Sequence, residues 1–553
     1  MKKQADIQKR AEGRVRRVAG RKAYFLLVLL LLLMAAAGRS MAGVSGNAAY
    51  VAAAGQQSIY QLDVAKSRGT IYDCKLRPLT GTSSRWVAAV APTIEAIGAL
   101  ETATGGRYRE RLAVALEDGK PFAMELERTV EHACVDMFRV PKRYEEDQLA
   151  PHVVGYLDGQ GKGAAGVELA MDDALDRHKG AVSVFYQVDA LGRVIAGAQR
   201  MVSDTMEATE NGVAVTIDSE LQRMAEKAAA RLGRGAVVIT EVPGCQIRAL
   251  ASMPDFAPTQ IAKAAQSQDA PLVNRAFSAY APGSVFKLVT AAAELESGGA
   301  LGEFTCTGAL NAGGLLFNCY DGEPHGKVDL QGAIAQSCNC YFISAARAMG
   351  GQPVLEMAYN LGLGAGQEFG RGLYAGAGAL PAGESLANAR ALANFSFGQG
   401  ALTVTPVQMC GLLNAIAAGG VYNSPKLIEG LVDGAGNLEP QQAVTDISRQ
   451  AMSGTAARRL QDYLVQAAKE GTGAGGNPEN CVCGIKTGTA QTGVYADGEE
   501  CAHFWYCGFV GDGSGPKYCI TVLRESVVQD GGVTAGVFRE IAGKLGEMLA
   551  EGA

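Results

Sequence analysis

The chain has 553 residues, of which 48% are hydrophobic and 19% charged, and its formal net charge is −6. This composition is that of a globular protein and excludes a wholly disordered chain. The length suits two to four domains. The net negative charge offers no basic footprint, so a protein dedicated to nucleic-acid binding is excluded as well.

The N-terminal segment has the pattern of a membrane-targeting sequence. The first 22 residues hold nine Lys and Arg against two Asp and Glu, and the sixteen residues 23–38 carry no charge. Sixteen residues is at the lower limit for an apolar helix that crosses a bilayer. Two interpretations stay open. A cleaved signal peptide would end near the small residues 35–38, whereas an uncleaved anchor would keep the basic residues in the cytoplasm and export the rest of the chain.

The next part of the chain contains a linker-like segment followed by both strand-like and helical patterns. Residues 43–57 are rich in Ala, Gly and Ser and are interpreted as a linker. Residues 61–206 alternate short strand-like runs with charged helical stretches and contain no repeat. The polar stretch 203–212 predicts a domain boundary. A strand at 213–217 and a helix that begins at the N-cap residue Asp218 are expected directly after it.

The C-terminal region predicts one large α/β domain. Two β-rich runs, 235–240 and 246–251, flank a Pro-Gly turn and predict a hairpin. A helical and Gly-rich middle follows over about 281–477. Three further strands and a final amphipathic helix are expected at 484–489, 503–510, 517–523 and 536–551. Strands at both ends of this region predict a single antiparallel sheet assembled around a helical middle.

The thirteen cysteines are an odd number and cannot all form disulfides. Several gather with a histidine near the C-terminus: Cys481, Cys483, Cys501, His503 and Cys507. Their spacing fits the usual zinc motifs poorly, so we predict no metal and no other cofactor, with the cysteines packed as small hydrophobes. A disulfide between Cys306 and Cys319 stays open for an oxidising compartment.

Ser284 and Lys287 are the first candidate catalytic residues. A Pro-Gly pair precedes Ser284 and predicts a helix start there, ahead of a helical run at 288–297. Residues three apart on a helix share one face, with Cβ atoms about 5–6 Å apart. A lysine that is shielded from water can lose its proton and act as the base for a serine hydroxyl. The helix N-terminus also offers an N–H group to an oxyanion.

Two further motifs follow in order along the chain. Ser337, Cys338 and Asn339 lie between helical stretches at 330–336 and 341–349, which predicts a loop. The sequence Lys-Thr-Gly-Thr at 486–489 is expected on a strand, where Gly488 leaves room for a substrate along the strand edge. Each motif alone is common in loops and strand ends. The ordered set SxxK, SxN and KTG is specific, because it is close to the combination of β-lactamases and penicillin-binding proteins.

With these motifs the chain resembles a class B penicillin-binding protein, a membrane-anchored peptidoglycan D,D-transpeptidase. The resemblance runs from the apolar segment to near the C-terminus. It is carried also by RGTIYD at 68–73, APHVVGY at 150–156, GVE at 166–168, NRA at 274–276, HG at 325–326, GQG at 398–400 and TPVQM at 405–409. One departure is Asp-Cys-Lys-Leu at 73–76, where the family usually has Asp-Arg-Asn-Gly. This departure is expected to weaken the turn that residues 73–76 form in the pedestal domain.

The resemblance implies a domain plan. It consists of a basic cytoplasmic tail at 1–22, a transmembrane anchor at 23–40, an α+β pedestal domain at 41–210 and a transpeptidase domain at 211–553. The last is expected to have the penicillin-recognising serine transpeptidase fold, an antiparallel sheet flanked by helices with an added all-helical region. The resemblance favours the uncleaved anchor, with a cytoplasmic N-terminus and an extracytoplasmic catalytic domain.

The resemblance also implies a role for each motif residue. Ser284 would be the acylated nucleophile and Lys287 its base. Ser337 would relay a proton to the leaving D-alanine, and Asn339 would bind the acyl-side amide. The remaining roles fall on the KTG segment: Lys486 keeps the site positive, Thr487 holds the terminal carboxylate, Gly488 gives the substrate room, and Thr489 forms the oxyanion hole with the Ser284 N–H.

The implied activity is cross-linking of peptidoglycan stem peptides, with covalent inhibition by β-lactams. The implied partners are stem peptides, β-lactams, the membrane, a separate glycan polymerase and cell-wall complex proteins, and no nucleic acid. Two alternatives stay open, a serine β-lactamase or penicillin sensor and a non-catalytic cell-wall scaffold. The segment 384–388 matches the lactamase pattern Glu-x-x-Leu-Asn only with its Leu one place early. Division, elongation and sporulation all remain compatible with the sequence.

Overall fold

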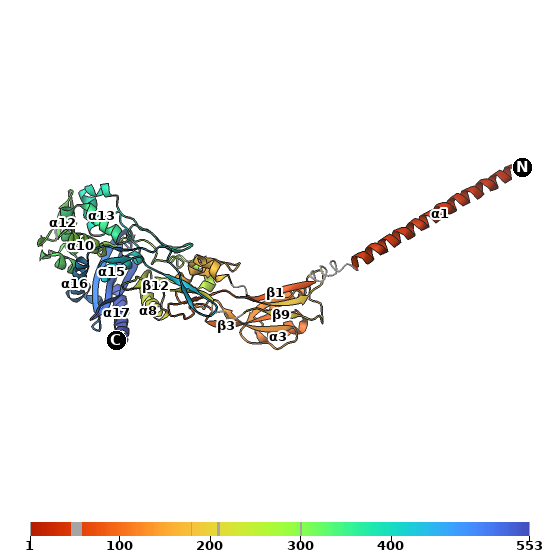
Figure 1. Ribbon diagram of the computed structural model, residues 1–553, viewed down its shortest axis with the longest axis horizontal. Coiled ribbons are helices and arrows are strands. Elements are labelled where there is room, and N and C mark those ends of the chain that lie inside the picture. The colour runs from red at the N-terminus through yellow and green to blue at the C-terminus, as the bar shows by residue number, and fades with distance from the viewer. Residues whose placement is uncertain (1, 46–57, 178–179, 207–210, 299–300, 552–553) are drawn as a thin grey trace. The chain divides into compact units, whose positions relative to one another are not determined.

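The computed structural model describes residues 2–45, 58–177, 180–206, 211–298 and 301–551. The chain forms two compact units (Figure 1). The first unit comprises Met1–Lys66, Arg85–Val140 and Gly180–Met206, and the second comprises Ser67–Ser84, Pro141–Lys179 and Glu207–Ala553. Two segments of the predicted 41–210 domain therefore belong to the second unit, so the units are not the two continuous stretches that the sequence predicts.

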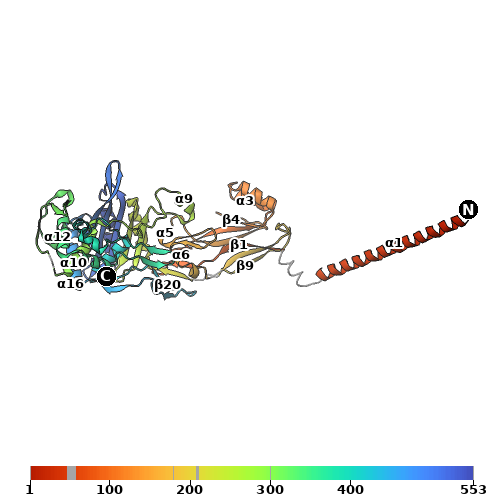
Figure 2. The same cartoon turned by 90° about the horizontal axis from the view of Figure 1, so that it is seen from above.

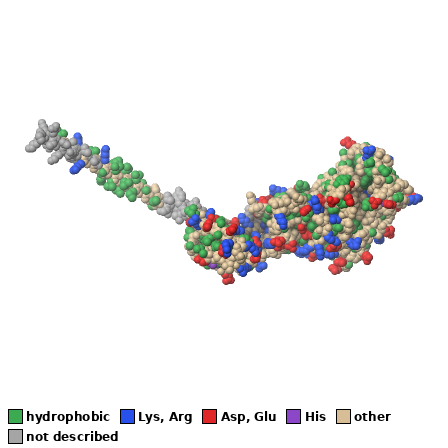
Figure 3. Space-filling view, turned by 180° about the vertical axis from the view of Figure 1, so that it is seen from behind, with side chains coloured by type: hydrophobic (Ala, Val, Ile, Leu, Met, Phe, Trp, Pro, Cys, Tyr) green, Lys and Arg blue, Asp and Glu red, His purple; other side chains and the backbone are tan. Residues whose placement is uncertain are grey.

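Helix α1 (Lys2–Ser45) contains a 24-residue candidate membrane span, Gly20–Gly43, whose mean hydropathy reaches 2.2 over an 18-residue window. Figure 3 shows hydrophobic side chains covering this part of the helix, with Lys and Arg gathered on its N-terminal side. The span is longer than the sixteen uncharged residues because the helix continues past Arg39. Its length and composition fit an anchor and a signal sequence alike. Most of the predicted linker, residues 46–57, lies outside the described residues.

The first unit has the expected α+β character. Its two three-stranded sheets have the orders β1-β8-β9 and β4-β3-β5. The strands are β1 (Ile59–Lys66), β3 (Ser83–Val90), β4 (Phe122–Leu126), β5 (Val135–Lys142), β8 (Ala181–Gln187) and β9 (Met201–Asp204), and the helices are α3 (Ile94–Ala103) and α4 (Arg109–Asp118). Ile97 and Leu100 of α3 pack with Val90 and Met124 in one core cluster, which places the helix against the sheet.

A buried carboxylate joins segments 67–84 and 141–179 to each other, and a strand pairing joins the first of them to the rest of the second unit. Glu168 is fully buried and accepts hydrogen bonds from Arg68 Nε at 2.7 Å, Arg143 Nε at 2.7 Å and Tyr144 Oη at 2.8 Å. Strand β2 (Thr70–Tyr72) also pairs in parallel with β10 (Gly212–Val215). A buried charge needs such partners. Arg68 belongs to the RGTIYD motif of the sequence, and Glu168 belongs to the GVE motif.

The turn that departs from the family pattern is formed nonetheless. The Asp73 carboxylate accepts hydrogen bonds from the backbone N–H groups of Lys75 at 2.9 Å and Arg77 at 2.8 Å. Leu76, where the family usually has glycine, adopts a φ of 57°. A branched residue in this left-handed region is strained, so the expected weakening has a structural basis in this one residue.

The predicted antiparallel sheet of the second unit is confirmed. Its five strands have the order β12-β11-β25-β24-β23, so the two ends of the region pair with each other (Figure 1). The strands are β11 (Gly235–Glu241), β12 (Ile247–Met253), β23 (Val482–Ala496), β24 (Glu499–Asp512) and β25 (Gly515–Val527). The sequence predicted shorter strands because the hairpin end of β23 and β24 is polar and exposed. β23 lies at the edge of the sheet.

Helices cover both faces of this sheet. Val237 and Ile239 of β11 pack in one cluster with α8 (Ser219–Ala229) and α17 (Val533–Glu551). Val238, between them, packs in the other cluster with α15 (Pro406–Ala417). Successive strand residues point to opposite faces, which explains the division. The predicted N-cap is confirmed, since the Asp218 side chain accepts a hydrogen bond from Glu220 N.

The middle of the chain forms the helical region that holds most of the candidate site. Helices α10, α12 and α16 lie together in both views (Figures 1 and 2). The region contains α10 (Lys287–Glu296), α11 (Leu330–Ala335), α12 (Asn339–Met349), α13 (Gly351–Asn360), α14 (Ala389–Ser396) and α16 (Gly454–Glu470). It also contains short two-stranded pairs that the sequence did not predict, among them β13 (Phe304–Cys306) with β16 (Gly326–Val328).

Candidate active site

Ser284 lies in a tight turn at the start of a helix, as predicted. It belongs to the 3₁₀ turn η3 (Gly283–Phe286), and α10 begins at Lys287 immediately after it. Side chains three residues apart in a 3₁₀ turn eclipse one another, so Ser284 and Lys287 lie on the same side of the chain. Ser284 is half-buried, whereas Lys287 is fully buried.

Close backbone packing holds this turn in place. Gly283 has a φ of 56°, and its N–H donates to Gly398 O at 2.9 Å. A Cβ atom on Gly398 would lie 1.9 Å from Gly283 O, so a side chain cannot fit there. Trp505 Nε1 donates to Ala281 O at 2.9 Å from the sheet side. The GQG motif, noted in the sequence without a role, thus supports the Ser284 turn.

Lys287 joins the first motif to the second. Its Nζ donates to Ser337 O at 2.6 Å, to Ser337 Oγ at 3.1 Å and to Asn339 Oδ1 at 2.6 Å. Ser337 precedes α12 with a φ of 56°, and Asn339 is the first residue of that helix. The predicted loop is therefore confirmed at Ser337 and Cys338, whereas Asn339 already belongs to the helix; we call Ser337, Cys338 and Asn339 together the SxN loop.

Lys486 joins the third motif to the same hydroxyl. Its Nζ donates to Ser337 Oγ at 2.9 Å, and its side chain is fully buried. A serine hydroxyl has two acceptor lone pairs and one proton to donate. Since Lys287 and Lys486 both donate to Ser337 Oγ, the Ser337 proton is left for a third group. This arrangement suits a proton relay.

Burial lowers the pKa of both lysine side chains. Burial lowers the pKa of Lys287 to about 7. Burial, and then the positive charge of Lys287, hold the pKa of Lys486 well below its usual range. Two ammonium groups that share one hydroxyl in a buried site repel each other, so the pair favours one neutral amine at neutral pH. A neutral amine is what a general base requires.

The KTG segment lies on the edge strand β23, as predicted. Thr487 is half-buried and Thr489 is exposed on this open edge. The Thr487 hydroxyl donates to Thr472 Oγ1 at 2.8 Å. Thr472 N in turn donates to Ala335 O at 3.0 Å, at the end of α11. Sequence reasoning missed Thr472, because it lies between two glycines outside any motif.

The expectation for Gly488 needs correction. A Cβ atom at this position would lie 2.8 Å from Pro282 O and 3.1 Å from Val285 N. The space is therefore filled by the Ser284 turn of the protein itself, not by an opening for a substrate. A Cβ atom on Gly283 would likewise lie 2.4 Å from Thr489 O. The glycines thus let the Ser284 turn rest directly on the edge strand, and all three motifs meet.

Both the oxygen and the nitrogen of the Asn339 side-chain amide form hydrogen bonds. Its Oδ1 accepts from Lys287, and its Nδ2 donates to Asn318 O at 2.7 Å. An amide nitrogen carries two protons, so one N–H remains for another partner. The side chain is half-buried.

The comparison with known protein families agrees with this arrangement of the three motifs. The model of the penicillin binding protein transpeptidase domain matches residues 235–543. The chain belongs to the penicillin-binding protein transpeptidase family. The resemblance to class B penicillin-binding proteins is thereby confirmed. The matched residues include the whole five-stranded sheet and all three motifs of this penicillin-binding protein.

Individual relatives agree with this membership. The chain is 28% identical over 413 residues to stage V sporulation protein D of Bacillus subtilis, a match that covers 71% of this chain and 62% of that protein. It is 32% identical over 323 residues to peptidoglycan D,D-transpeptidase PbpA of Mycolicibacterium smegmatis, covering 54% of this chain and 62% of that protein. The matches thus span less than two thirds of each relative's own length.

The fold is shared with solved penicillin-binding proteins. The structure of penicillin binding protein 3 from Mycobacterium tuberculosis with aztreonam matches with a TM-score of 0.64 and 21% identity, covering 88% of this chain and 97% of that one. The D,D-transpeptidase domain of a peptidoglycan glycosyltransferase from Eggerthella lenta matches with a TM-score of 0.62 and 22% identity, covering 88% and 99%. The expected penicillin-recognising transpeptidase fold is confirmed.

Proposed function

We propose that this protein is a peptidoglycan D,D-transpeptidase that works through an acyl-enzyme on Ser284. The observation that carries the proposal is the Ser337 hydroxyl, which is held between Lys287 at 3.1 Å and Lys486 at 2.9 Å beside the Ser284 turn. Two buried amines on one hydroxyl are costly to assemble, and such perturbed groups concentrate at catalytic sites. The relative PbpA of Mycolicibacterium smegmatis is named a D,D-transpeptidase.

The proposed acylation step assigns a role to each of these groups. Neutral Lys287 takes the proton of Ser284, whose Oγ attacks the carbonyl carbon of the penultimate D-alanine. The N–H groups of Ser284 and Thr489 stabilise the oxyanion. The C–N bond then breaks as Ser337 gives its proton to the nitrogen of the leaving D-alanine and takes from Lys287 the proton that came from Ser284. The ester on Ser284 remains.

Transfer completes the reaction. An amine of a neighbouring stem peptide attacks the ester carbonyl, a new amide bond forms, and the proton of the amine returns to Ser284 through the lysines. Asn339 offers its remaining N–H to the acyl-side backbone. The exposed edge of β23 lets the donor peptide lie along the strand. β-Lactams, which contain a reactive amide, acylate Ser284 by the same first step, in which the C–N bond of the lactam ring breaks.

The lactamase alternative is less well supported. A deacylating lactamase must aim a water molecule at the ester, and the candidate segment is 384–388. Its Asn388 accepts hydrogen bonds from Arg390 N and Ala391 N as the N-cap of α14, and Glu384 is exposed. These residues serve a helix start, not a water site. A scaffold role remains compatible with catalysis, and a separate glycan polymerase and other cell-wall proteins are proposed partners.

For the N-terminal segment we favour an uncleaved anchor. The basic residues before the span would keep the N-terminus in the cytoplasm, and the catalytic unit would face outward. This position gives the enzyme access to its peptidoglycan substrate outside the membrane. Protease added to protoplasts would then digest the chain beyond about residue 39, while a mature N-terminus near residue 40 would contradict the anchor.

The acyl-enzyme is tested by mapping the adduct of a labelled penicillin. The full chain, purified in detergent, is incubated with the label, digested and analysed by mass spectrometry. One penicilloyl group on the peptide that contains Ser284 is expected. A label on another residue, or none at all, would refute the proposed site.

Thr487→Val tests how the substrate carboxylate is bound. We expect acylation by carboxylate-bearing substrates to slow by about tenfold to a hundredfold, because a hydrogen bond to a charged group contributes about 1.5–3 kcal/mol. Valine has nearly the shape of threonine, so the strand should persist. The measurement is kcat/KM for paired substrates with a free and an amidated carboxylate. Thr492→Val, on the same strand, is the control and should leave both rates unchanged.

The pairing of substrates makes the Thr487 result specific. A rate loss confined to the free carboxylate assigns the hydroxyl to carboxylate recognition. Equal losses for both substrates, or no loss, would mean that Thr487 only packs the strand or orients Thr472.

A further inference from the structure

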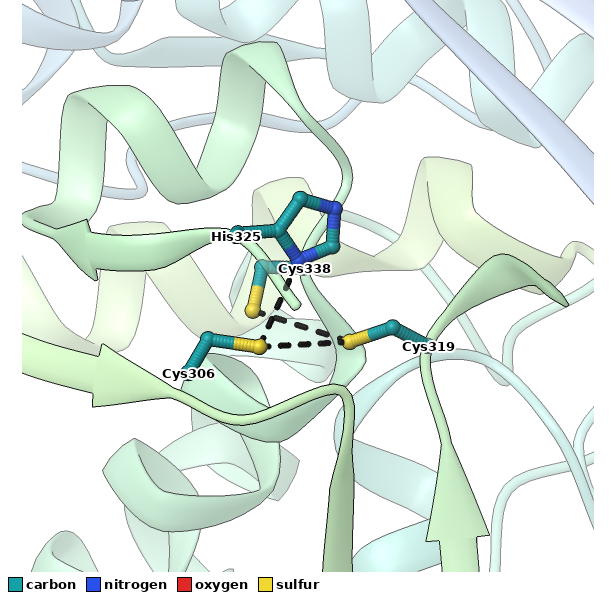
Figure 4. Close-up of side chains that lie close together, drawn as sticks. All are labelled: Cys306, Cys319, His325 and Cys338. Carbon is teal, nitrogen blue, oxygen red and sulfur yellow. Dashed lines mark hydrogen bonds between the residues drawn. The ribbon is translucent and has the colours of Figure 1, made fainter. Parts of the chain in front are cut away.

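Three cysteines and a histidine lie together beside the SxN loop (Figure 4). One ligand atom from each of Cys306, Cys319, His325 and Cys338 lies within 4.8 Å of every other. They come from four separate segments. Cys306 ends β13, Cys319 follows β15 (Leu315–Asn318), His325 precedes β16, and Cys338 lies between α11 and α12. The pairing of β13 with β16 brings the first and third together.

Three of the six separations between these atoms are close to the edges of a tetrahedral metal site, and the other three are at most 4.8 Å. Cys306 Sγ lies 3.7 Å from Cys319 Sγ and 3.4 Å from His325 Nδ1, and Cys319 Sγ lies 3.8 Å from Cys338 Sγ. Zinc binds thiolate at about 2.3 Å and imidazole at about 2.0–2.1 Å. A tetrahedron with these bonds has S···S edges of about 3.8 Å and S···N edges of about 3.6 Å.

The surroundings suit sulfur ligands. Cys306, Cys319 and Cys338 are 1%, 3% and 0% exposed, so water does not compete for them. Gly308 N donates to Cys306 Sγ at 3.4 Å, and Tyr341 N donates to Cys338 Sγ at 3.4 Å. N–H groups directed at ligand sulfurs are the outer contacts that orient thiolates and offset their charge.

Ordinary packing accounts less well for the cluster. The sequence predicted that the cysteines pack as small hydrophobes, and the Cys481 and Cys483 pair fits this, with only two sulfurs 3.6 Å apart. In the cluster a polar imidazole joins three buried sulfurs, and a fourth buried sulfur, Cys340 Sγ, lies 3.5 Å from Cys319 Sγ. The disulfide that stayed open for Cys306 and Cys319 is not formed, since both are free thiols in the structure.

We propose that Cys306, Cys319, His325 and Cys338 bind one Zn²⁺ ion and that this ion fixes the SxN loop. Three thiolates and one imidazole are a donor set that selects zinc among the common divalent metals. The protein supplies all four ligands, which is typical of a structural zinc site. Binding displaces the protons of the three thiols, and no redox step is involved.

The ion would act on the active site through position. Cys338 lies between Ser337 and Asn339, and Cys319 follows Asn318, whose carbonyl accepts from Asn339 Nδ2 at 2.7 Å. Zinc bonds to Cys338 and Cys319 would therefore hold the chain on both sides of the Asn339 amide. Ser337, which the two lysines contact, would be held by the same bond.

Metal analysis of the purified chain tests the proposal. The full chain is purified in detergent with a thiol reductant, dialysed against metal-free buffer, and its zinc content is measured by inductively coupled plasma mass spectrometry. We expect about one zinc per wild-type chain and near none in Cys306→Ser and His325→Ala. Cys481→Ser, which removes a cysteine from the other close pair, is the matched control and should keep its zinc.

Cobalt binding gives a second, spectroscopic readout of the same four ligands. Cobalt(II) added to metal-free wild type should give thiolate-to-cobalt charge-transfer absorption, which Cys306→Ser should weaken and Cys481→Ser should preserve. Wild type that binds neither zinc nor cobalt would overturn the proposal. So would zinc retained in full by both ligand variants, or a Cys306–Cys319 disulfide found by peptide mapping of protein isolated without reductant.

The effect on the active site rests on the proposed function and is measured separately. Removal of zinc by a chelator should slow penicillin acylation at least tenfold, and added zinc should restore the rate. Zinc bound at one per chain with no change in acylation on its removal would keep the metal site but refute its role at the SxN loop. Failure of acylation in zinc-loaded wild type would instead count against the proposed function.

Discussion

Replacing Ser284 by alanine is expected to lower the rate of acylation by penicillin by roughly a thousandfold or more. In the proposed mechanism Ser284 Oγ forms the ester, and loss of a nucleophile that acts as a unit with its base typically costs several orders of magnitude. The turn should persist, because it is held by Gly283 and Gly398 backbone contacts and not by the Ser284 side chain. Time-resolved labelling with a fluorescent penicillin measures the rate.

Ser297→Ala provides the matched control for this result. Ser297 caps the other end of α10, where its hydroxyl donates to Ala293 O at 2.8 Å. Its loss should leave the labelling rate unchanged. If Ser284→Ala labels as fast as wild type, Ser284 is not the nucleophile, and the roles assigned to Lys287 and Ser337 lose their basis.

Replacing Lys287 by methionine is expected to slow acylation by about a hundredfold to ten thousandfold, the usual contribution of general-base catalysis. Methionine fills a similar volume but has no amine. The pH profile makes the test specific. The pKa of Lys287 is lowered to about 7, and only its neutral form accepts a proton, so the wild-type rate should rise as the pH increases through about 7. In Lys287→Met this rise should disappear.

Lys227→Met is the control for a lost lysine elsewhere. Lys227 is exposed on α8, and its replacement should change neither the rate nor the pH profile. A Lys287→Met variant that is slow but keeps the wild-type rise near pH 7 would assign the titration to another group, with Lys486 the nearest candidate. A variant with the wild-type rate would remove Lys287 from the mechanism.

The sheet of the second unit could be predicted because its signals are local. A strand shows as a short apolar run, a Pro-Gly turn marks the β11–β12 hairpin, and Asp218 marks the start of α8. The strand ends could not be predicted. The outer part of β23 is exposed, and it extends beyond the predicted strand because it pairs with β24.

The candidate site could be proposed from the sequence for the same reason, since its residues lie in short motifs that the fold brings together. Thr472 could not be found, because its role depends on the approach of the α16–β23 connection to Thr487. Gly488 was interpreted wrongly, because a sequence does not tell which neighbour fills the space beside a glycine. The cysteine cluster was missed because its ligands are spread over four segments, whereas zinc motifs are recognised by close pairs.

The two units differ from the predicted domains because their limits are set by contacts in the tertiary structure. The chain crosses between the units several times, and the contacts that decide where 67–84 and 141–179 belong join residues far apart in sequence. The Arg68 and Glu168 pair is separated by 100 residues. The sequence offers no local signal for such a contact except the two motifs themselves, which are recognisable only by family resemblance.

The measurement that tests the central claim most directly is the fate of the acyl group. The wild-type chain is incubated with a stem pentapeptide that ends in D-alanyl-D-alanine and with an acceptor peptide that carries a free amine, and the products are separated by liquid chromatography and mass spectrometry. Our account predicts a cross-linked dimer with one D-alanine released for each cross-link, and neither product from Ser284→Ala. Release of D-alanine to water alone, or rapid penicillin turnover without any dimer, would contradict the transpeptidase function.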